Sequence, residues 1–167
     1  MTTRIKEGDR LPEGNFWVMD ANGVDTVSTH ELFAGKKIVF FGVPGAFTST
    51  CSRSHLPGFI NHADAIFAAG ADAIACMSVN DAAVMHAWGI DRGVGDKILM
   101  LADGNCDYAN SLGLSIDASA FGSGMRSLRF AMIVDDGAVS WLRVDEPGKF
   151  ELTRAEDALD ALTSGNG

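Results

Sequence analysis

The chain has 167 residues and a mass of 17.6 kDa, with 47% hydrophobic and 21% charged residues. This size fits one domain, expected over residues 1–167, and the composition can supply a core rather than a disordered chain. Acidic residues number 22 against 13 basic ones, and the formal charge of −9 argues against nucleic-acid binding. The apolar runs are too short to cross a membrane, so no membrane association is expected.

The cysteines bound the class of protein further. Cys51, Cys76 and Cys106 are an odd number at wide spacings, which is neither a disulfide scaffold nor a zinc pattern. His55 lies four residues after Cys51, but two ligands do not make a metal site, so we expect no metal and no cofactor. The N-terminal residues lack a secretory signal and contain Glu7, which is untypical of a transit peptide. We therefore expect a cytoplasmic protein.

The first third of the chain begins with strands and ends in a helix. Residues 16–19 and 24–27 predict a hairpin joined by an Asn-Gly turn. The continuous apolar run over 37–43 predicts a strand buried on both faces. A helix is expected over about 50–69, and Pro57 within it should kink or divide it.

Strands and helices continue to alternate in the middle of the chain. Residues 73–79 predict a second buried strand, followed by a helix that Asn80 or Asp81 can cap. Residues 98–101 predict a third strand, and 107–112 a short helix.

The last third predicts a hairpin and a final helix. Residues 128–134 and 138–144 flank an Asp-Gly turn, and the Thr153–Glu156 segment reads as a capping box at a helix start. Strand–helix–strand units followed by an antiparallel hairpin predict an α/β sandwich with a mixed sheet.

The loop after the first buried strand is the candidate reactive segment. In open α/β sheets, sites gather beyond the carboxyl ends of the strands, where helices begin. With Thr48 as the N-cap, Cys51 falls at the third helical position, among unpaired amides that favour a thiolate. The alternative for the same position is an inert buried cysteine.

Several motifs identify a family resemblance. Residues 44–52, PGAFTSTCS, resemble the P-x-x-x-(T/S)-x-x-C signature of peroxiredoxins. Residues 41–59, with MSVND at 77–81 and RSLRF at 126–130, are similar to the peroxiredoxin-5-like (type II) branch, and the resemblance covers nearly the whole chain in order. It implies a thioredoxin-like three-layer α/β sandwich with a mixed central sheet. It also implies a thiol-dependent peroxidase that reduces hydrogen peroxide and organic hydroperoxides in antioxidant defence.

The same resemblance implies catalytic roles. Cys51 would be the peroxidatic cysteine, whose thiolate attacks the peroxide and becomes a sulfenic acid. Thr48 would hydrogen-bond the peroxide, a role compatible with capping, and Pro44 would shield the sulfenic acid. Arg129 would orient the thiolate and stabilise the leaving oxygen. If Arg126 shared its strand, the odd spacing would turn it to the opposite face.

Two aromatic and two histidine positions also bear on the site. Phe47 and Phe121 either form an apolar collar that admits organic peroxides or pack in the core. His55 and His86 are expected to be solvated or structural.

The reductant is expected to come from outside the chain. Residues 151–167 contain no cysteine, unlike family members with a C-terminal resolving cysteine. Cys76 lies in an apolar strand and is expected to be inert. Cys106 follows a turn and, if it is exposed, is the one candidate in the chain for a resolving cysteine. Glutathione, glutaredoxin or thioredoxin would then recycle Cys51, and the resemblance implies a homodimer.

Two alternatives stay open at this point. Residues 51–54 read C-x-x-S, as in a monothiol glutaredoxin-like module, although the Pro-Gly-Ala-Phe-Thr lead is foreign to that family. A non-catalytic redox sensor or chaperone is the second. A phosphatase loop is excluded, because its C-x5-R pattern needs an arginine where Pro57 stands.

Overall fold

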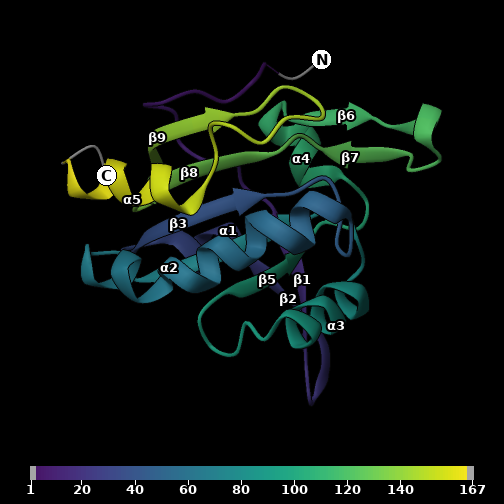
Figure 1. The fold of residues 1–167 in the computed structure, drawn as a ribbon, viewed down its shortest axis with the longest axis horizontal. Helices are drawn as coiled ribbons and strands as arrows, with labels where there is room; N and C mark the ends of the chain where they lie inside the picture. The colour runs from purple at the N-terminus through teal and green to yellow at the C-terminus, as the bar shows by residue number, and fades with distance from the viewer. Residues whose placement is uncertain (1–2, 165–167) are drawn as a thin grey trace.

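A seven-stranded mixed sheet forms the centre of the computed structural model, which describes residues 3–164, so the terminal residues of the predicted domain 1–167 lie outside it (Figure 1). Its strands are β1 (Asn15–Asp20), β2 (Gly23–Ser28), β3 (Lys37–Gly42), β4 (Ala73–Ser78), β5 (Leu99–Ala102), β8 (Phe130–Asp135) and β9 (Ala138–Val144). Their order is β2-β1-β5-β4-β3-β8-β9. The β3–β4 and β4–β5 pairs are parallel and the others antiparallel.

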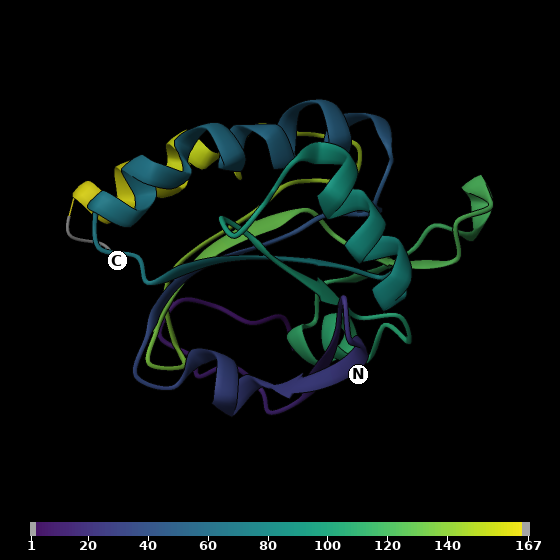
Figure 2. The same ribbon diagram turned by 90° about the horizontal axis from the view of Figure 1, so that it is seen from below.

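Helices cover both faces of this sheet. They are α1 (Thr29–Phe33), the π-helical turn η1 (Cys51–His55), α2 (Leu56–Ala68), α3 (Ala82–Arg92), α4 (Asp107–Leu112) and α5 (Ala155–Thr163). Figure 2 shows α2, α3 and α5 on one side and α1 and α4 on the other, which confirms the predicted three-layer α/β sandwich. Among residues 3–164, no helix combines the length and apolar character that a membrane span requires.

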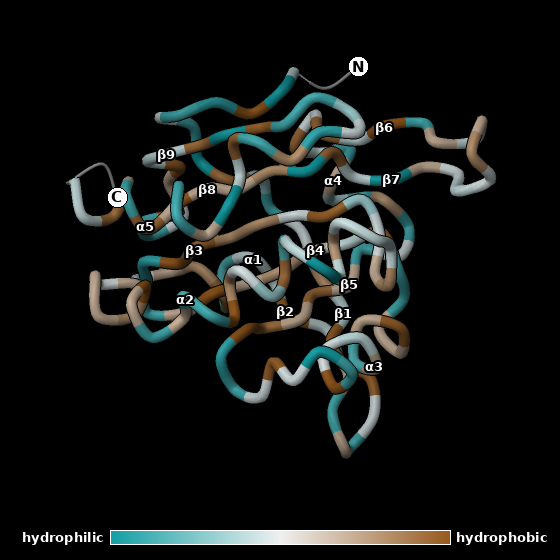
Figure 3. Tube along the Cα trace, viewed as in Figure 1, coloured by the Kyte–Doolittle hydropathy of each residue, from teal (hydrophilic) through white to brown (hydrophobic). Residues whose placement is uncertain are grey.

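Strand β3 is buried on both faces, which explains why its sequence is apolar without alternation. Ile38 and Phe40 pack in the core under α1 and α4, whereas Val39 and Phe41 pack in the core under α2, α3 and α5. Because successive side chains point to opposite faces, a strand covered on both sides needs apolar residues throughout. Figure 3 shows this strand as mainly hydrophobic. Its carboxyl end therefore delivers the following loop to the edge of a rigid, buried sheet.

A second, two-stranded sheet extends from the main body. It consists of β6 (Ser115–Asp117) and β7 (Met125–Ser127), which pair antiparallel and are joined through the 3₁₀ turn η2 (Ser119–Phe121). Figure 1 shows it reaching outward beyond the end of the main sheet. The sequence analysis did not foresee this excursion, because strands of three residues leave too short a pattern to detect.

The predicted helix over about 50–69 is divided near Pro57, as expected. The π turn η1 comes first, and α2 follows with Pro57 in its first turn, where a missing N–H costs no hydrogen bond. Thr48 directly precedes the helical residues 49–50, and its carbonyl accepts the Ser52 N–H at 2.9 Å, so it occupies the predicted N-cap position. Its hydroxyl does not cap a backbone N–H and donates instead to the Gly45 carbonyl at 2.6 Å.

The N-cap predicted for α3 is confirmed, whereas the one predicted for α5 is not. Asp81, one of the two expected caps, accepts the Val84 N–H at 2.9 Å. The predicted capping box beginning at Thr153 is wrong, because Arg154 is the N-cap of α5. The Thr153 hydroxyl donates instead to the carboxylate of Asp145, at 2.7 Å.

Gly42, at the end of β3, gives a stability test. A Cβ atom there would lie 2.0 Å from Cε2 of the buried Phe130 ring. We expect Gly42→Ala to lower the free energy of unfolding by about 1–3 kcal/mol, as overpacked cores do. Chemical denaturation followed by circular dichroism measures it.

Gly58→Ala is the matched control, because its Cβ would meet only the Ala155 Cβ, at 4.0 Å. In the first turns of α2 this change should raise stability by up to about 1 kcal/mol. Equal stability of the two variants would contradict the packing argument at Gly42.

Candidate active site

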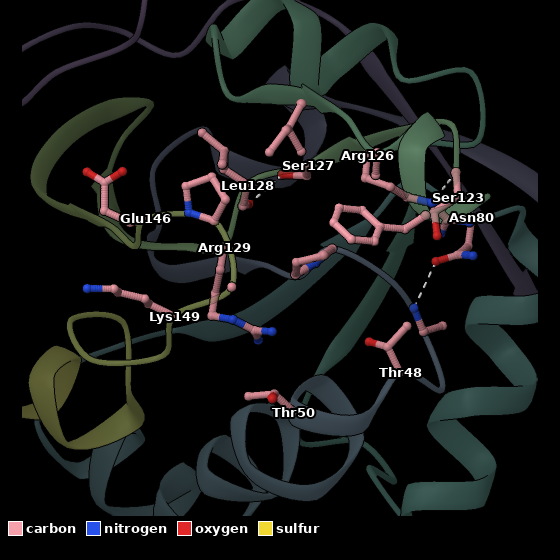
Figure 4. A pocket seen from close by; sticks show the side chains of 17 residues that line it. Thr48, Thr50, Asn80, Ser123, Arg126, Ser127, Leu128, Arg129, Glu146 and Lys149 are labelled. Atoms are coloured by element: carbon pink, nitrogen blue, oxygen red, sulfur yellow. Dashed lines mark hydrogen bonds between the residues drawn. The ribbon is translucent and has the colours of Figure 1, made fainter.

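The loop after β3 is fixed by an asparagine from the neighbouring strand. Asn80 follows β4, and its Oδ1 accepts the Ala46 N–H at 2.9 Å and the Ser78 hydroxyl at 2.6 Å. Figure 4 shows the contact with the loop as a dashed line. Because β3 and β4 are parallel, their carboxyl ends lie together, and Asn80 can hold the loop that leads to Cys51.

Cys51 begins the π turn and is buried. Its carbonyl accepts the Leu56 N–H, a bond that closes a wider turn than that of an α-helix, and its exposed fraction is 1%. The next residue, Ser52, is held from α3: its hydroxyl accepts the Trp88 indole N–H at 2.9 Å and its carbonyl accepts from Arg92 at 3.2 Å. Helix α3 therefore anchors the turn that carries the sulfur.

Arg129 faces the sulfur of Cys51. The arginine lies between β7 and β8 and is 8% exposed. One guanidinium nitrogen, Nη2, donates to Sγ of Cys51 at 3.2 Å, and Nη1 donates to Nδ1 of His55 at 2.9 Å. Since a guanidinium can only donate, Nδ1 must accept, and the ring proton lies on Nε2. Nε2 donates it to the Thr153 carbonyl at 2.8 Å.

His55 is a neutral member of this cluster. Burial, followed by the charge of Arg129, lowers the pKa of His55 to about 3. The rings of Phe41 and Phe150 both lie 4.9 Å from its ring, and that of Phe59 lies at 5.5 Å, between centroids. Phe150 also lies 5.4 Å from the Arg129 guanidinium carbon. The positive charge is thus oriented by a neutral ring and a sulfur within apolar surroundings.

A cavity of about 480 Å³ opens beside the cluster. Arg129 lines the cavity and also contacts the sulfur of Cys51, which does not itself line it. Figure 4 shows Thr48, Thr50 and Arg129 around the cavity. Its apolar wall comes from the second sheet and its flanks: Ile116, Phe121 and Leu128.

Most of the residues that the sequence singled out meet here. Pro44, Thr48 and Arg129 line the cavity, and so does Phe121, which is 87% exposed. Phe47 does not line it: its backbone has a φ of 64°, and its ring lies 6.5 Å from that of Trp88. The structure therefore does not bring the two phenylalanines into one collar.

Arg126 also lines the cavity, which the strand-face argument did not anticipate. That argument needs both arginines in one strand, but β7 ends at Ser127, before Arg129. Arg126 donates to the carbonyls of Ser123 and Val79, at 2.9 and 3.2 Å. It braces the cavity wall, whereas Arg129 addresses the sulfur.

His55 is buried and hydrogen-bonded at both ring nitrogens, so of the two roles expected for it, solvated or structural, the structure has the structural one. Its contact with Arg129 was not predicted. The available signal was the spacing of four residues from Cys51, which sequence reasoning tested only against metal binding. The sequence offered Asn80 and Thr153 as helix caps and gave no signal of their contacts at the site, because each contact depends on segments far apart in the sequence.

The two remaining cysteines are both buried. Cys106, the candidate for a resolving cysteine if exposed, is only 3% exposed, so the structure does not meet that condition. Burial, and then the charges of Asp103 and Asp107, raise the pKa of the Cys106 thiol. Burial raises the pKa of the Cys76 thiol well above its ordinary value. Neither thiol is set up as a nucleophile.

Comparisons with known proteins settle the family. The Redoxin family model matches residues 6–159. Over 166 residues the chain is 45% identical to Peroxiredoxin-2E, chloroplastic, of Arabidopsis thaliana, covering 97% of this chain and 71% of that protein. The chain belongs to the peroxiredoxin family.

Further relatives agree. This peroxiredoxin is 49% identical to Peroxiredoxin-2E-2, chloroplastic, of rice (Oryza sativa subsp. japonica), with 95% and 72% of the two chains covered. It superimposes with a TM-score of 0.91 and 49% identity on reduced Prx3 of Vibrio vulnificus in complex with hydrogen peroxide, covering 95% and 99%. The predicted peroxiredoxin resemblance and thioredoxin-like fold are confirmed, and the protein is a peroxidase that uses a thiol reductant.

The predicted cytoplasmic location is wrong. Two of the relatives that match along nearly the whole peroxiredoxin chain are chloroplastic proteins. The prediction rested on the N-terminal residues, which resemble neither a secretory signal nor a transit peptide, and on free, widely spaced cysteines, which indicate a reducing compartment. Free cysteines do not separate the cytosol from other reducing compartments, so they cannot assign a protein to the cytosol.

The neutral His55 of this peroxiredoxin gives a pH prediction. Its pKa of about 3 in the folded state lies below the ordinary value of 6.5, so the unfolded state takes up the proton first as the pH falls. The His55 contribution to stability is complete above pH 6.5. It should be lost on acidification from there towards pH 3, by at most about 1.4 kcal/mol per pH unit.

Urea denaturation at pH 7 and pH 5 measures this loss. His55→Gln removes the titrating group while keeping a donor and an acceptor, and should show a smaller loss than the wild type. His30→Gln, at an exposed position, is the control and should behave like the wild type. An identical pH dependence in the His55 variant would contradict the prediction.

Proposed function

We propose that Cys51 is the peroxidatic cysteine of this peroxiredoxin. Its thiolate attacks one oxygen of a hydroperoxide, so that an S–O bond forms while the O–O bond breaks. The products are a Cys51 sulfenic acid and an alkoxide, or a hydroxide from hydrogen peroxide, which takes a proton from solvent. The observation that carries the proposal is the 3.2 Å contact between Arg129 Nη2 and the Cys51 sulfur.

The residues around the sulfur divide the work. Arg129 presents a positive charge where the leaving oxygen becomes negative, which favours the transition state over the ground state. The Thr48 hydroxyl donates to the Gly45 carbonyl, so its oxygen lone pairs are free to accept the peroxide proton. Pro44 lines the cavity without an N–H to offer and shields the sulfenic acid from water.

The cavity supports organic hydroperoxides as substrates beside hydrogen peroxide. Hydrogen peroxide is little larger than water, whose share of liquid volume is about 30 Å³. The cavity of about 480 Å³ has room for an organic group, and Ile116, Phe121 and Leu128 offer it apolar contact. We propose Phe121 as a substrate-binding residue. Phe47 was expected to share this role, but it does not line the cavity, so we propose no substrate contact for it.

The geometry of the other cysteines supports an external reductant. A thiol outside the chain attacks the sulfenic sulfur and releases water, and a second thiol then releases the Cys51 thiolate as a disulfide forms. Cys76 and Cys106 are both buried with raised thiol pKa values. Glutathione with glutaredoxin, or thioredoxin, would fill this role in antioxidant defence.

We also propose a homodimer, as the family resemblance implies. The large apolar side chains of Phe121, Ile90 and Val24 are exposed, and a second copy of the chain could bury such side chains. Sedimentation velocity at micromolar concentration distinguishes a dimer from a monomer.

The cysteine assignment predicts a sharp contrast between variants. Cys51→Ser should abolish the first oxidation by hydrogen peroxide and by cumene hydroperoxide, because no other thiol is positioned to react. Cys106→Ser and Cys76→Ser should keep it. Stopped-flow peroxide consumption measures the rates, and mass spectrometry after one equivalent of peroxide identifies the product. Disulfide formation from Cys51 to Cys76 or Cys106, in place of a trappable sulfenic acid, would overturn the external reductant.

Arg129→Lys tests the charge geometry. Lysine keeps the positive charge but cannot hold His55 and the sulfur with two parallel donors. We expect kcat/KM for hydrogen peroxide to fall by about 10²–10³-fold, the effect of removing one donor to a developing oxyanion. Arg126→Lys is the matched control on the cavity wall and should lose far less. An equal loss in both variants would assign Arg129 no special role.

A further inference from the structure

A buried carboxylate lies next to the active site, outside the machinery described so far. Asp145 directly follows β9 and is 2% exposed. Its Oδ1 accepts the N–H groups of Glu151 and Leu152, at 3.0 and 2.9 Å, and its Oδ2 accepts the Thr153 hydroxyl at 2.7 Å. Burying a carboxyl group costs free energy unless it is hydrogen-bonded, so these three bonds are needed to hold Asp145 in the interior.

Asp145 closes the loop that leads from β9 to α5. The loop begins after Asp145, and the N–H groups of Glu151 and Leu152 at its far end donate to the Asp145 side chain. Figure 1 shows this loop beside the main sheet, before α5. The backbone N–H of Asp145 also donates to the Arg129 carbonyl at 3.0 Å. One residue therefore ties the loop end to the strand segment that carries the catalytic arginine.

The closed loop reaches the reactive centre through two contacts. Phe150 lies against the His55 ring and below the Arg129 guanidinium. The Thr153 carbonyl accepts the His55 Nε2 proton at 2.8 Å. That bond holds the ring in the tautomer whose Nδ1 can accept from Arg129.

The behaviour of Thr153 points the same way. Its sequence position, three residues before Glu156, suits an N-cap hydroxyl. The structure uses Arg154 as the N-cap instead and gives the hydroxyl to Asp145. A local helix signal is thus overridden at a residue whose carbonyl orients the active-site histidine, and such conflicts are typical of functional sites.

We propose that Asp145 and Thr153 are positioning residues for the peroxidase reaction, acting through His55 on Arg129. This inference rests on the proposed function of Cys51 and Arg129. The Asp145 carboxylate fixes the Thr153 hydroxyl and the loop, the Thr153 carbonyl fixes the His55 tautomer and orientation, and His55 fixes one arm of the guanidinium. The other arm then meets the sulfur and the leaving oxygen.

The central test is Thr153→Val, which removes the hydroxyl and nearly keeps the side-chain shape. We expect the second-order rate constant for hydrogen peroxide to fall by about 10–100-fold, since small displacements of catalytic groups cost this much. The pH profile of Cys51 alkylation by iodoacetamide should also move to higher pH. Thr153→Ser, which restores the hydroxyl, should recover both readouts.

Thr163→Val, at the last residue of α5, is the matched control. The Thr163 hydroxyl donates to the carbonyls of Leu159 and Asp160 in its own helix. This variant should keep the wild-type rate and pH profile. Asp145→Ala is measured beside it and should resemble Thr153→Val, because it removes the oxygen that accepts the Thr153 hydroxyl proton. If Thr153→Val does not fold, Asp145→Ala decides the question.

Thermal unfolding separates a positioning role from a structural one. A lower melting temperature in Thr153→Val with an unchanged peroxide rate and pH profile would overturn the inference. Failure of the underlying function looks different, because Cys51→Ser would then keep its peroxide reactivity. Loss of activity in Cys51→Ser with no effect at Thr153 and Asp145 would overturn the positioning role alone.

Discussion

The proposed active site depends on holding one buried guanidinium in one orientation. Arg129 makes two directed contacts, to a sulfur and to an imidazole, and lies over an aromatic ring. A long, charged side chain has many rotamers, and ordering it in an apolar environment is costly. The surrounding elements meet this demand: β3 and Asn80 place the loop, α3 anchors the π turn, and the loop before α5 supplies Phe150 and the Thr153 carbonyl.

Elements whose pattern is local could be predicted from the sequence. The buried strands β3 and β4, the two hairpins and α4 follow from apolar runs and turn residues, and the structure has them within a residue or two at each end. The π turn at Cys51 could not be foreseen, since it depends on Ser52 being held by Trp88 and Arg92 from another helix. Thr153 misled because a buried carboxylate eight residues earlier competes for its hydroxyl.

The same division applies to the site. Pro44, Thr48 and Cys51 lie in one short motif, so the sequence could place them together, and the family pattern added Arg129 across a gap of 78 residues. Phe47 shows the limit of such transfer, because a left-handed backbone at that position turns its ring away from the cavity. His55 was visible as a residue but not as a partner, since its contacts come from β3, α2 and the segment before α5.

The fixed tautomer of His55 limits which reactions the cysteine can perform. In thiol hydrolases a histidine takes the proton of the cysteine and returns it to the departing amine. Here both imidazole nitrogens are already engaged, one with Arg129 and the other with a peptide carbonyl, so the ring has no free lone pair for such a shuttle. Amide cleavage needs that shuttle, because an amine leaves only with a proton. Breaking an O–O bond does not, because the alkoxide or hydroxide that leaves can take its proton from water afterwards.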